Sequence, residues 1–358
     1  MKPSLFGQIH SNRDYTKAEC WGKNQFNSSF PASLVAYMFS KNLKPVYIKT
    51  DHENNIVHNY IDGEELFGIN PLSEDAYYAF EVGYAPFEDF YQGEREKIDL
   101  VMSNYQTKEL LCGLEIKLTA LPDNTTKSLP ESEWGTEIVM RPPTICFLAC
   151  SICSNYRTLE GKERLRSMLQ NVPQINHWEE SDEVLPHFHE ILVSVLSVST
   201  DMCDHQKPLI IQPIWKTEGN KMRLKEGCLD VFVWSNLSII QMCCMEDSFD
   251  IKKLNRFNRT IIWLYKMLLD YVTYNMFDYK RIIRLQSYNL ANDKAFALSG
   301  TKTHAFLQGD EIANPRISKY EIKNIILGGG QELLSPERRF DAVLVNSPDI
   351  FVEDDKGR

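Results

Sequence analysis

Residues 110–120, LLCGLEIKLTA, place two charged side chains inside an otherwise apolar segment. Successive side chains of a β-strand point to opposite faces, so Glu115 and Lys117 would share one face and Ile116 would point into the core. Charges in an apolar strand cost free energy unless they are paired or bound to a metal ion. The segment is therefore predicted to be a buried strand that carries a polar site on one face.

A second apolar run, residues 98–102, precedes this strand and contains Asp99. Residues 103–108 between the two runs are mostly polar, so the runs are predicted to pair as a β-hairpin. That pairing would bring Asp99 beside Glu115, with Lys117 next to them at one end of the sheet. A cross-strand ion pair between Asp99 and Lys117 is the simpler alternative, and it needs no metal.

Two carboxylates beside a lysine are the groups that hydrolysis of a phosphodiester requires. Asp99 and Glu115 offer hard oxygen ligands for Mg²⁺, as one or two ions, and the backbone carbonyl of Ile116 would be a third protein ligand. Lys117 would orient the attacking water and offset the negative charge that develops on the phosphate. A metal-dependent hydrolytic site is therefore predicted here.

The rest of the chain predicts an α/β (mixed α+β) fold, in which helices flank a central mixed β-sheet. Short apolar runs predict strands at residues 46–48, 56–58, 209–215 and 229–234. Helical spacing of apolar residues predicts helices at residues 29–39, 72–92 (as far as Pro86), 185–199 and 251–285. Residues 122–135 are expected to form a loop, residues 328–330 a turn, and residues 342–345 a last apolar run.

The charge balance limits how the chain can meet a nucleic acid. It carries 39 Lys and Arg against 49 Asp and Glu, a net charge of −10, so binding to a polyanion would need a local basic patch. The predicted helix at residues 251–285 is rich in cations, and contacts with backbone phosphates are favoured over a merely solvated face. The candidate phosphate-binding residues are Arg141, Lys221, Arg223, Lys252, Lys253, Arg256, Arg259, Lys280, Arg281 and Arg284.

The positions of Asp99, Glu115 and Lys117 are similar to the three catalytic positions of the PD-(D/E)XK nuclease superfamily. Ile98 stands where that motif has Pro, at a position that is loose in the superfamily. In such sites a helical carboxylate before the first strand often joins the metal ligands. Glu81, in the predicted helix at residues 72–92, is the preferred candidate, and a solvated helix face is the alternative.

A closer resemblance covers nearly the whole chain. The segments SLFGQIHSNRD (4–14), WGKNQFNSSFPASLVAYM (21–38) and EIVMRPPT (137–144) look like the type II restriction endonucleases of the HindVP/HgiDI family. The resemblance implies Mg²⁺-dependent cleavage of double-stranded DNA at GRCGYC, after the purine, with 5′-phosphate ends. A single restriction-endonuclease domain is expected over residues 1–358, with the catalytic core at about 70–160 and DNA-contacting and dimerisation elements at about 205–340.

A palindromic target implies a homodimer in which each subunit cuts one strand, and a separate host methyltransferase that protects the same sites. The sequence contains no apolar run long enough to span a membrane and no apolar signal core, so a bacterial cytoplasmic protein without membrane contact is expected. A structure-specific or repair nuclease and a non-catalytic DNA-binding protein on the same core remain alternatives.

The nine cysteines offer a rival interpretation, an iron–sulfur or metabolic enzyme. Cys146, Cys150 and Cys153 are spaced so that they share one face of a helix, and their neighbours are apolar. A cluster would need an exposed loop from which three thiolates reach the same iron atoms. The spacing therefore predicts buried core cysteines.

Overall fold

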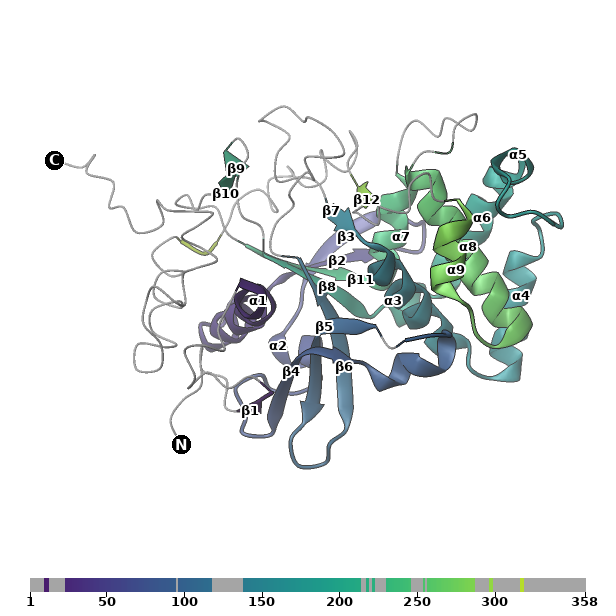
Figure 1. Ribbon diagram of the computed structural model, residues 1–358. Helices are drawn as coiled ribbons and strands as arrows, with labels where there is room; N and C mark the ends of the chain where they lie inside the picture. Colours follow the sequence, from purple (N-terminus) through teal and green to yellow (C-terminus); the bar gives the residue numbers. More distant parts are fainter. Residues whose placement is uncertain are drawn as a thin grey trace.

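An eight-stranded mixed sheet forms the centre of the computed structural model (Figure 1). The structure describes residues 10–12, 23–94, 96–117, 138–213, 217–218, 221–222, 230–245, 254, 256–286, 296–298 and 316–318. In order across the sheet, the strands are β1 (His10–Ser11), β4 (Ala76–Gly83), β5 (Lys97–Asn104), β6 (Leu110–Ile116), β8 (Pro208–Pro213), β11 (Val231–Ser235), β2 (Val46–Thr50) and β3 (Ile56–Tyr60). The predicted central mixed sheet is confirmed.

Two hairpins account for half of these strands; the sequence predicts the β5–β6 hairpin and the two separate strands of the other. β2 pairs antiparallel with β3, and β5 pairs antiparallel with β6. At the turn between β5 and β6, the side chain of Asn104 accepts hydrogen bonds from the backbone N–H groups of Gln106 and Thr107. This side-chain turn closes the hairpin at the end opposite to Asp99 and Glu115.

Residues 72–92 do not form the predicted helix. They form β4 and the 3-10 helix η3 (Ala85–Phe90). Ala76, Tyr78 and Phe80 are buried while the residues between them are half-buried, which is the two-residue period of a strand. Aromatic side chains favour strands, and pairing with β1 on one side and β5 on the other outweighs the local helical spacing.

Helices cover both faces of the sheet (Figure 1). On one face, α1 (Lys23–Ser40) packs against β4, β5, β6 and β8, where the sequence predicts a helix at residues 29–39. The other face is covered by α3 (Pro142–Cys153), α6 (Phe188–Asp201), α7 (Asn236–Cys244) and α8 (Arg256–Tyr274), and α4 (Leu159–Leu169) packs on α6 and α8. The helix predicted at residues 185–199 is the short η6 (Leu185–His187) followed by α6.

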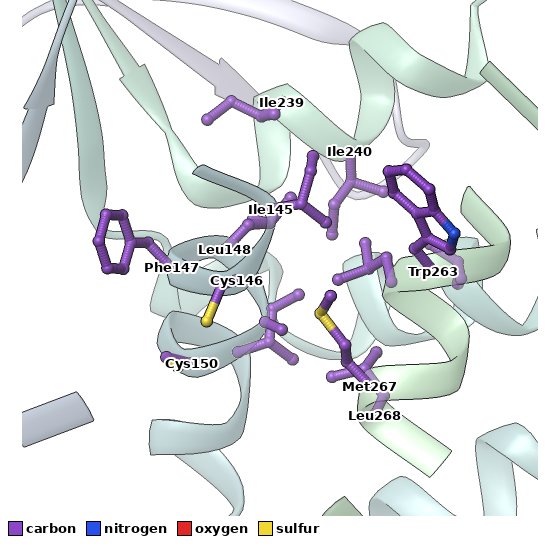
Figure 2. Packing of buried hydrophobic residues seen from close by; sticks show 14 of the residues in the cluster. Ile145, Cys146, Phe147, Leu148, Cys150, Ile239, Ile240, Trp263, Met267 and Leu268 are labelled. Atoms are coloured by element: carbon purple, nitrogen blue, oxygen red, sulfur yellow. The ribbon is translucent and has the colours of Figure 1, made fainter. Parts of the chain in front are cut away.

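The three cysteines of α3 lie in the core between the sheet and α8. Cys146, Cys150 and Cys153 are fully buried, and Figure 2 shows the first two on α3, with Met267 and Leu268 of α8 beside it. Burial raises the pKa of the Cys150 and Cys153 thiols well above the ordinary value, so both stay protonated. The prediction of buried core cysteines is confirmed.

The helix predicted at residues 251–285 is divided into α8 and α9 (Tyr279–Leu285). The break follows α8 at Asn275, which has a left-handed backbone with φ 66°. Just before α9, the N–H of Phe277 donates to the carbonyl of Phe90 at 2.9 Å. A tertiary hydrogen bond to the segment before β5 therefore stabilises an arrangement that a continuous helix could not make.

The other described elements are small. They are α2 (Gly63–Phe67), α5 (Ser181–Val184), η5 (Ser154–Tyr156), η7 (Cys203–His205), the pair β9 (Thr217–Glu218) with β10 (Lys221–Met222), and the pair β7 (Ile138–Met140) with β12 (Phe296–Leu298). The strands predicted at 209–215 and 229–234 correspond to β8 and β11 where they are described, whereas 122–135, 328–330 and 342–345 lie outside the described residues. In the described part of the chain, no helix combines the length and apolar character needed to cross a membrane.

Candidate active site

The first residues of β5 and the last residues of β6 lie at the same end of the sheet because the two strands are antiparallel. Their ladder reaches the pair Leu100 and Leu114. Beyond that pair, the N–H of Ile116 donates to the Asp99 carboxylate at 2.8 Å. A side-chain oxygen therefore takes the place of a backbone acceptor, and the Asp99 carboxylate is held between the two strands beside Glu115.

Glu115 and Lys117 form the second part of the site. The Lys117 ammonium donates to Glu115 Oε1 at 2.8 Å, and the side chains of Lys117 and Glu115 are only 14% and 10% exposed. Thr144 in the first turn of α3 donates to the same oxygen at 3.4 Å. Oε2 of Glu115 is buried and has no hydrogen-bond partner among the described residues. Asp99, Glu115 and Lys117 therefore converge as the sequence predicts.

The Asp99 carboxyl group is held in an environment that opposes ionisation. Burial is the largest cause, and with the negative charge of Glu115 it raises the pKa of Asp99 to about 7, although Lys117 and the Ile116 N–H lower it. Two carboxylates so placed repel each other when both are charged. A bound cation would relieve this repulsion.

Glu81 lies on strand β4 and not on the predicted helix. Its neighbours Phe80 and Val82 pair with Leu100 and Ile98 of β5, so Glu81 is level with Asp99 on the adjacent strand. The residue has a left-handed backbone with φ 54°, a strained conformation that is uncommon in a strand. Its charge makes a further, smaller contribution to the raised pKa of Asp99.

The described residues fit a divalent cation with oxygen ligands. Asp99 and Glu115 supply carboxylates, and one oxygen of Glu115 has no donor among these residues. Within the described ranges, no three His, Cys, Asp or Glu side chains are grouped so that they could hold a metal ion together. A site built here would therefore rely on two carboxylates and on a backbone carbonyl, for which Ile116 is the candidate.

The predicted phosphate-binding residues differ in their exposure and in their partners. Arg141 is exposed at the cap of α3, in the turn that brings Thr144 to Glu115. Arg259 is 8% exposed, and its guanidinium lies 5.0 Å from the centre of the Trp263 ring, so it belongs to the packed interior and does not offer an exposed phosphate contact. Lys280 pairs with Glu96 at 3.1 Å.

Arg281 and Arg284 are exposed on α9 and line a cavity of about 760 Å³, together with Lys280, Gln92, Gly93, Glu179, Asp278 and Leu285. For the other candidate phosphate-binding residues, the structure describes at most the backbone. Lys221 is in β10 and Arg256 begins α8, whereas Arg223, Lys252 and Lys253 lie outside the described residues.

Two polar residues near the site were not expected from the sequence. Thr144 contacts Glu115 from α3, and Gln212 is a fully buried side chain on β8, the strand next to β6. Thr144 follows two prolines in the segment RPPT, and Gln212 interrupts the apolar run LIIQP. A polar residue inside an apolar run was the available signal, as it was for Glu115.

The model of the HindVP restriction endonuclease family matches residues 21–351. The type II restriction enzyme HgiDI of Herpetosiphon aurantiacus is 43% identical over 358 residues, which cover 98% of each chain. The "probable type II restriction enzyme HindVP" of Haemophilus influenzae is 41% identical over 355 residues, which cover 98% of this chain and 96% of that protein. No solved structure matches the chain. By the extent of these matches, the chain belongs to the HindVP restriction endonuclease family.

Proposed function

We propose that this chain is a type II restriction endonuclease that uses Mg²⁺ to hydrolyse double-stranded DNA at a short palindrome. The observation that carries the proposal is the convergence of Asp99, Glu115 and Lys117 at one end of the sheet, with a buried Glu115 oxygen that lacks a donor among the described residues. A buried carboxylate oxygen without a donor costs free energy, so the unbonded Glu115 oxygen favours a bound cation over a purely structural ion pair.

Asp99 and Glu115 would hold the ion, with the Ile116 carbonyl as the third protein ligand and Glu81 as a nearby carboxylate. When bound, Mg²⁺ supplies positive charge to the scissile phosphate and makes a neighbouring water more acidic. Lys117, held by Glu115 at 2.8 Å, would orient the attacking water and offset the charge on the phosphate.

The reaction is an in-line displacement at phosphorus. A bond forms from the water oxygen to phosphorus while the bond to the 3′ oxygen breaks, and its electron pair leaves with that oxygen. The water loses a proton to solvent, and the departing oxygen gains one. The products would be a 5′-phosphate and a 3′-hydroxyl.

The proposed target is GRCGYC, cut after the purine. Similarity over nearly the full length to two type II restriction enzymes supports a target of this kind. A palindromic site has two-fold symmetry, so we propose a homodimer in which each subunit cuts one strand. The enzyme would act in the bacterial cytoplasm alongside a methyltransferase that protects the host's own sites.

We propose that the cavity beside α9 contacts DNA phosphates near the scissile bond. Gly93, in the cavity wall, precedes Asp99 by six residues, so the two are at most about 20 Å apart along the chain. B-DNA rises about 3.4 Å per base pair, so this distance spans about six base pairs. Arg281 and Arg284 would therefore contact the same stretch of backbone, as would Arg141 at the start of α3.

The test is digestion of a long DNA of known sequence by the purified protein, with Mg²⁺ or with EDTA. Discrete bands that require Mg²⁺, with ends that map to GRCGYC, are expected. Lys117→Ala should abolish cleavage and retain DNA binding. Lys108→Asn is the matched control at the opposite end of the same hairpin, where the left-handed backbone tolerates Asn, and it should cut normally.

Each of the other outcomes contradicts a defined part of the proposal. A smear in place of bands would point to a nonspecific or repair nuclease. Tight DNA binding without cleavage in any divalent metal would point to a non-catalytic protein. Full activity of Lys117→Ala would refute the site.

A further inference from the structure

Gln212 is fully buried on β8, next to the strand that carries the site. β6 and β8 run parallel, with Ile116 opposite Ile211. The N–H of Lys117 donates to the Ile211 carbonyl at 2.9 Å, so Lys117 and Gln212 follow at the same level of the two strands. Neighbouring strands are about 4.8 Å apart, and the two side chains therefore begin close together.

Gln212 also lies on the same face of the sheet as the site. Glu115 is opposite Ile210, and Ile210 belongs to the core beneath α3, α6 and α8. Trp234, which bonds to the Gln212 side chain, belongs to that core as well. Since side chains two residues apart on a strand return to the same face, Lys117 and Gln212 project on the side that carries Glu115.

Half of the Gln212 amide is bonded within the described part of the chain. The indole Nε1 of Trp234 donates to Gln212 Oε1 at 2.9 Å, which fixes the orientation of the amide group. The amide nitrogen Nε2 is buried and has no hydrogen-bond partner among the described residues. An unmet buried donor destabilises the folded protein, so an accepting group is expected to bind there.

Glu115 supplies the complementary atom, because its Oε2 is a buried acceptor that lacks a partner among the same residues. A buried water is typically held by two to four polar partners. Gln212 Nε2 and Lys117 Nζ are two donors, and Glu115 Oε2 is an acceptor, on adjacent strands and on one face. A carboxylate oxygen has two lone pairs, so Oε2 can accept from a water and still face a cation.

We propose that Gln212 is a further catalytic residue of this enzyme, whose amide N–H donates to the oxygen of the attacking water and holds it beside Lys117. This inference rests on the proposed function and adds to it a second donor for the nucleophile. Trp234 is then a positioning residue, because its indole keeps the Gln212 oxygen turned away from that water.

The test uses Gln212→Met and Gln212→Glu in the full-length protein. Met removes the donor at any pH, and Glu, assayed at pH 8 and above to ionise it, removes the donor and keeps the acceptor for Trp234. Single-turnover cleavage in saturating Mg²⁺ should slow by about 10²-fold, as for loss of one fixed donor in other active sites. DNA affinity in EDTA should stay within about twofold. Gln241→Met on α7, whose Oε1 is also buried and unbonded among the described residues, should cleave normally.

A thermal melt of each variant without metal or DNA separates the catalytic role from a structural one. A buried amide that only supports the fold would lower the melting temperature of Gln212→Met and leave the cleavage rate of the folded fraction unchanged, and that result would overturn the proposal. So would normal cleavage by Gln212→Glu, should Gln212→Met not fold. If Lys117→Ala also cuts normally, the site assignment itself is wrong; if it is inactive while the Gln212 variants are active, only this inference fails.

Discussion

Asp99→Asn should abolish cleavage and at the same time stabilise the metal-free protein at pH 8. In that state Asp99 is a buried carboxylate next to a second carboxylate, and both features raise its pKa from 3.8 to about 7. Asn has nearly the same shape and carries no charge. Its amide oxygen can still accept the hydrogen bond from the Ile116 N–H, which is 2.8 Å long in the native protein.

The magnitude follows from the raised pKa. Each pKa unit corresponds to about 1.4 kcal/mol, so ionising Asp99 in the folded protein costs at most about 4 kcal/mol. Rearrangement of the site reduces this, and we expect a gain of about 2–4 kcal/mol. Because the folded state binds the proton more tightly than the unfolded chain, the native protein loses this stability as pH rises from about 4 through about 7.

Thermal unfolding in EDTA at pH 5 and at pH 8 provides the assay. For a chain of 358 residues, the expected gain corresponds to about 3–5 °C at pH 8, and the difference should be smaller at pH 5. Mg²⁺ at pH 8 should raise the melting temperature of the native protein and leave that of Asp99→Asn nearly unchanged. Asp182→Asn, at an exposed position on α5, is the control and should change stability by less than about 0.5 kcal/mol.

The reasoning would be refuted by an Asp99→Asn protein that melts at or below the native temperature at pH 8 in EDTA. Residual Mg²⁺-dependent cleavage by that variant would remove Asp99 from the site.

Two further predictions concern DNA binding and the anchoring of residues 316–318. Replacing both Arg281 and Arg284 by Ala should weaken DNA binding and reduce the slope of log K against log salt by about 2, because two phosphate contacts are lost. Filter binding at several salt concentrations measures the slope. An unchanged slope would contradict the proposed phosphate contacts. Arg316→Ala should destabilise the protein by about 3–5 kcal/mol, because the fork of Arg316 holds the 2% exposed carboxylate of Asp230 at 3.0 Å through two hydrogen bonds. Denaturant unfolding tests it, and a loss below about 1 kcal/mol would show that Asp230 finds another partner.

Local sequence predicted the hairpin and the three converging side chains correctly. The pairing of residues 98–120 could be predicted locally, because two apolar strands joined by a short polar turn can pair in few ways. Once they pair, Asp99 lies beside Glu115, and strand alternation places Lys117 with Glu115. Family membership could also be predicted from the sequence, because it depends on residue identities along the chain and not on contacts.

Long-range contacts decided the rest. Residues 76–83 have helical spacing as well as strand propensity, and pairing with β1 and β5 selects the strand. Asn275 ends α8 because the following segment bonds to the chain before β5, which the local pattern of apolar residues does not encode. Thr144 contacts Glu115, and Gln212 lies level with Lys117 on the adjacent strand, although the two residues follow Glu115 by 29 and 97 positions in the sequence. Periodicity describes which face of an element is apolar, but it does not specify which distant element packs on that face, and that packing placed Thr144 against Glu115.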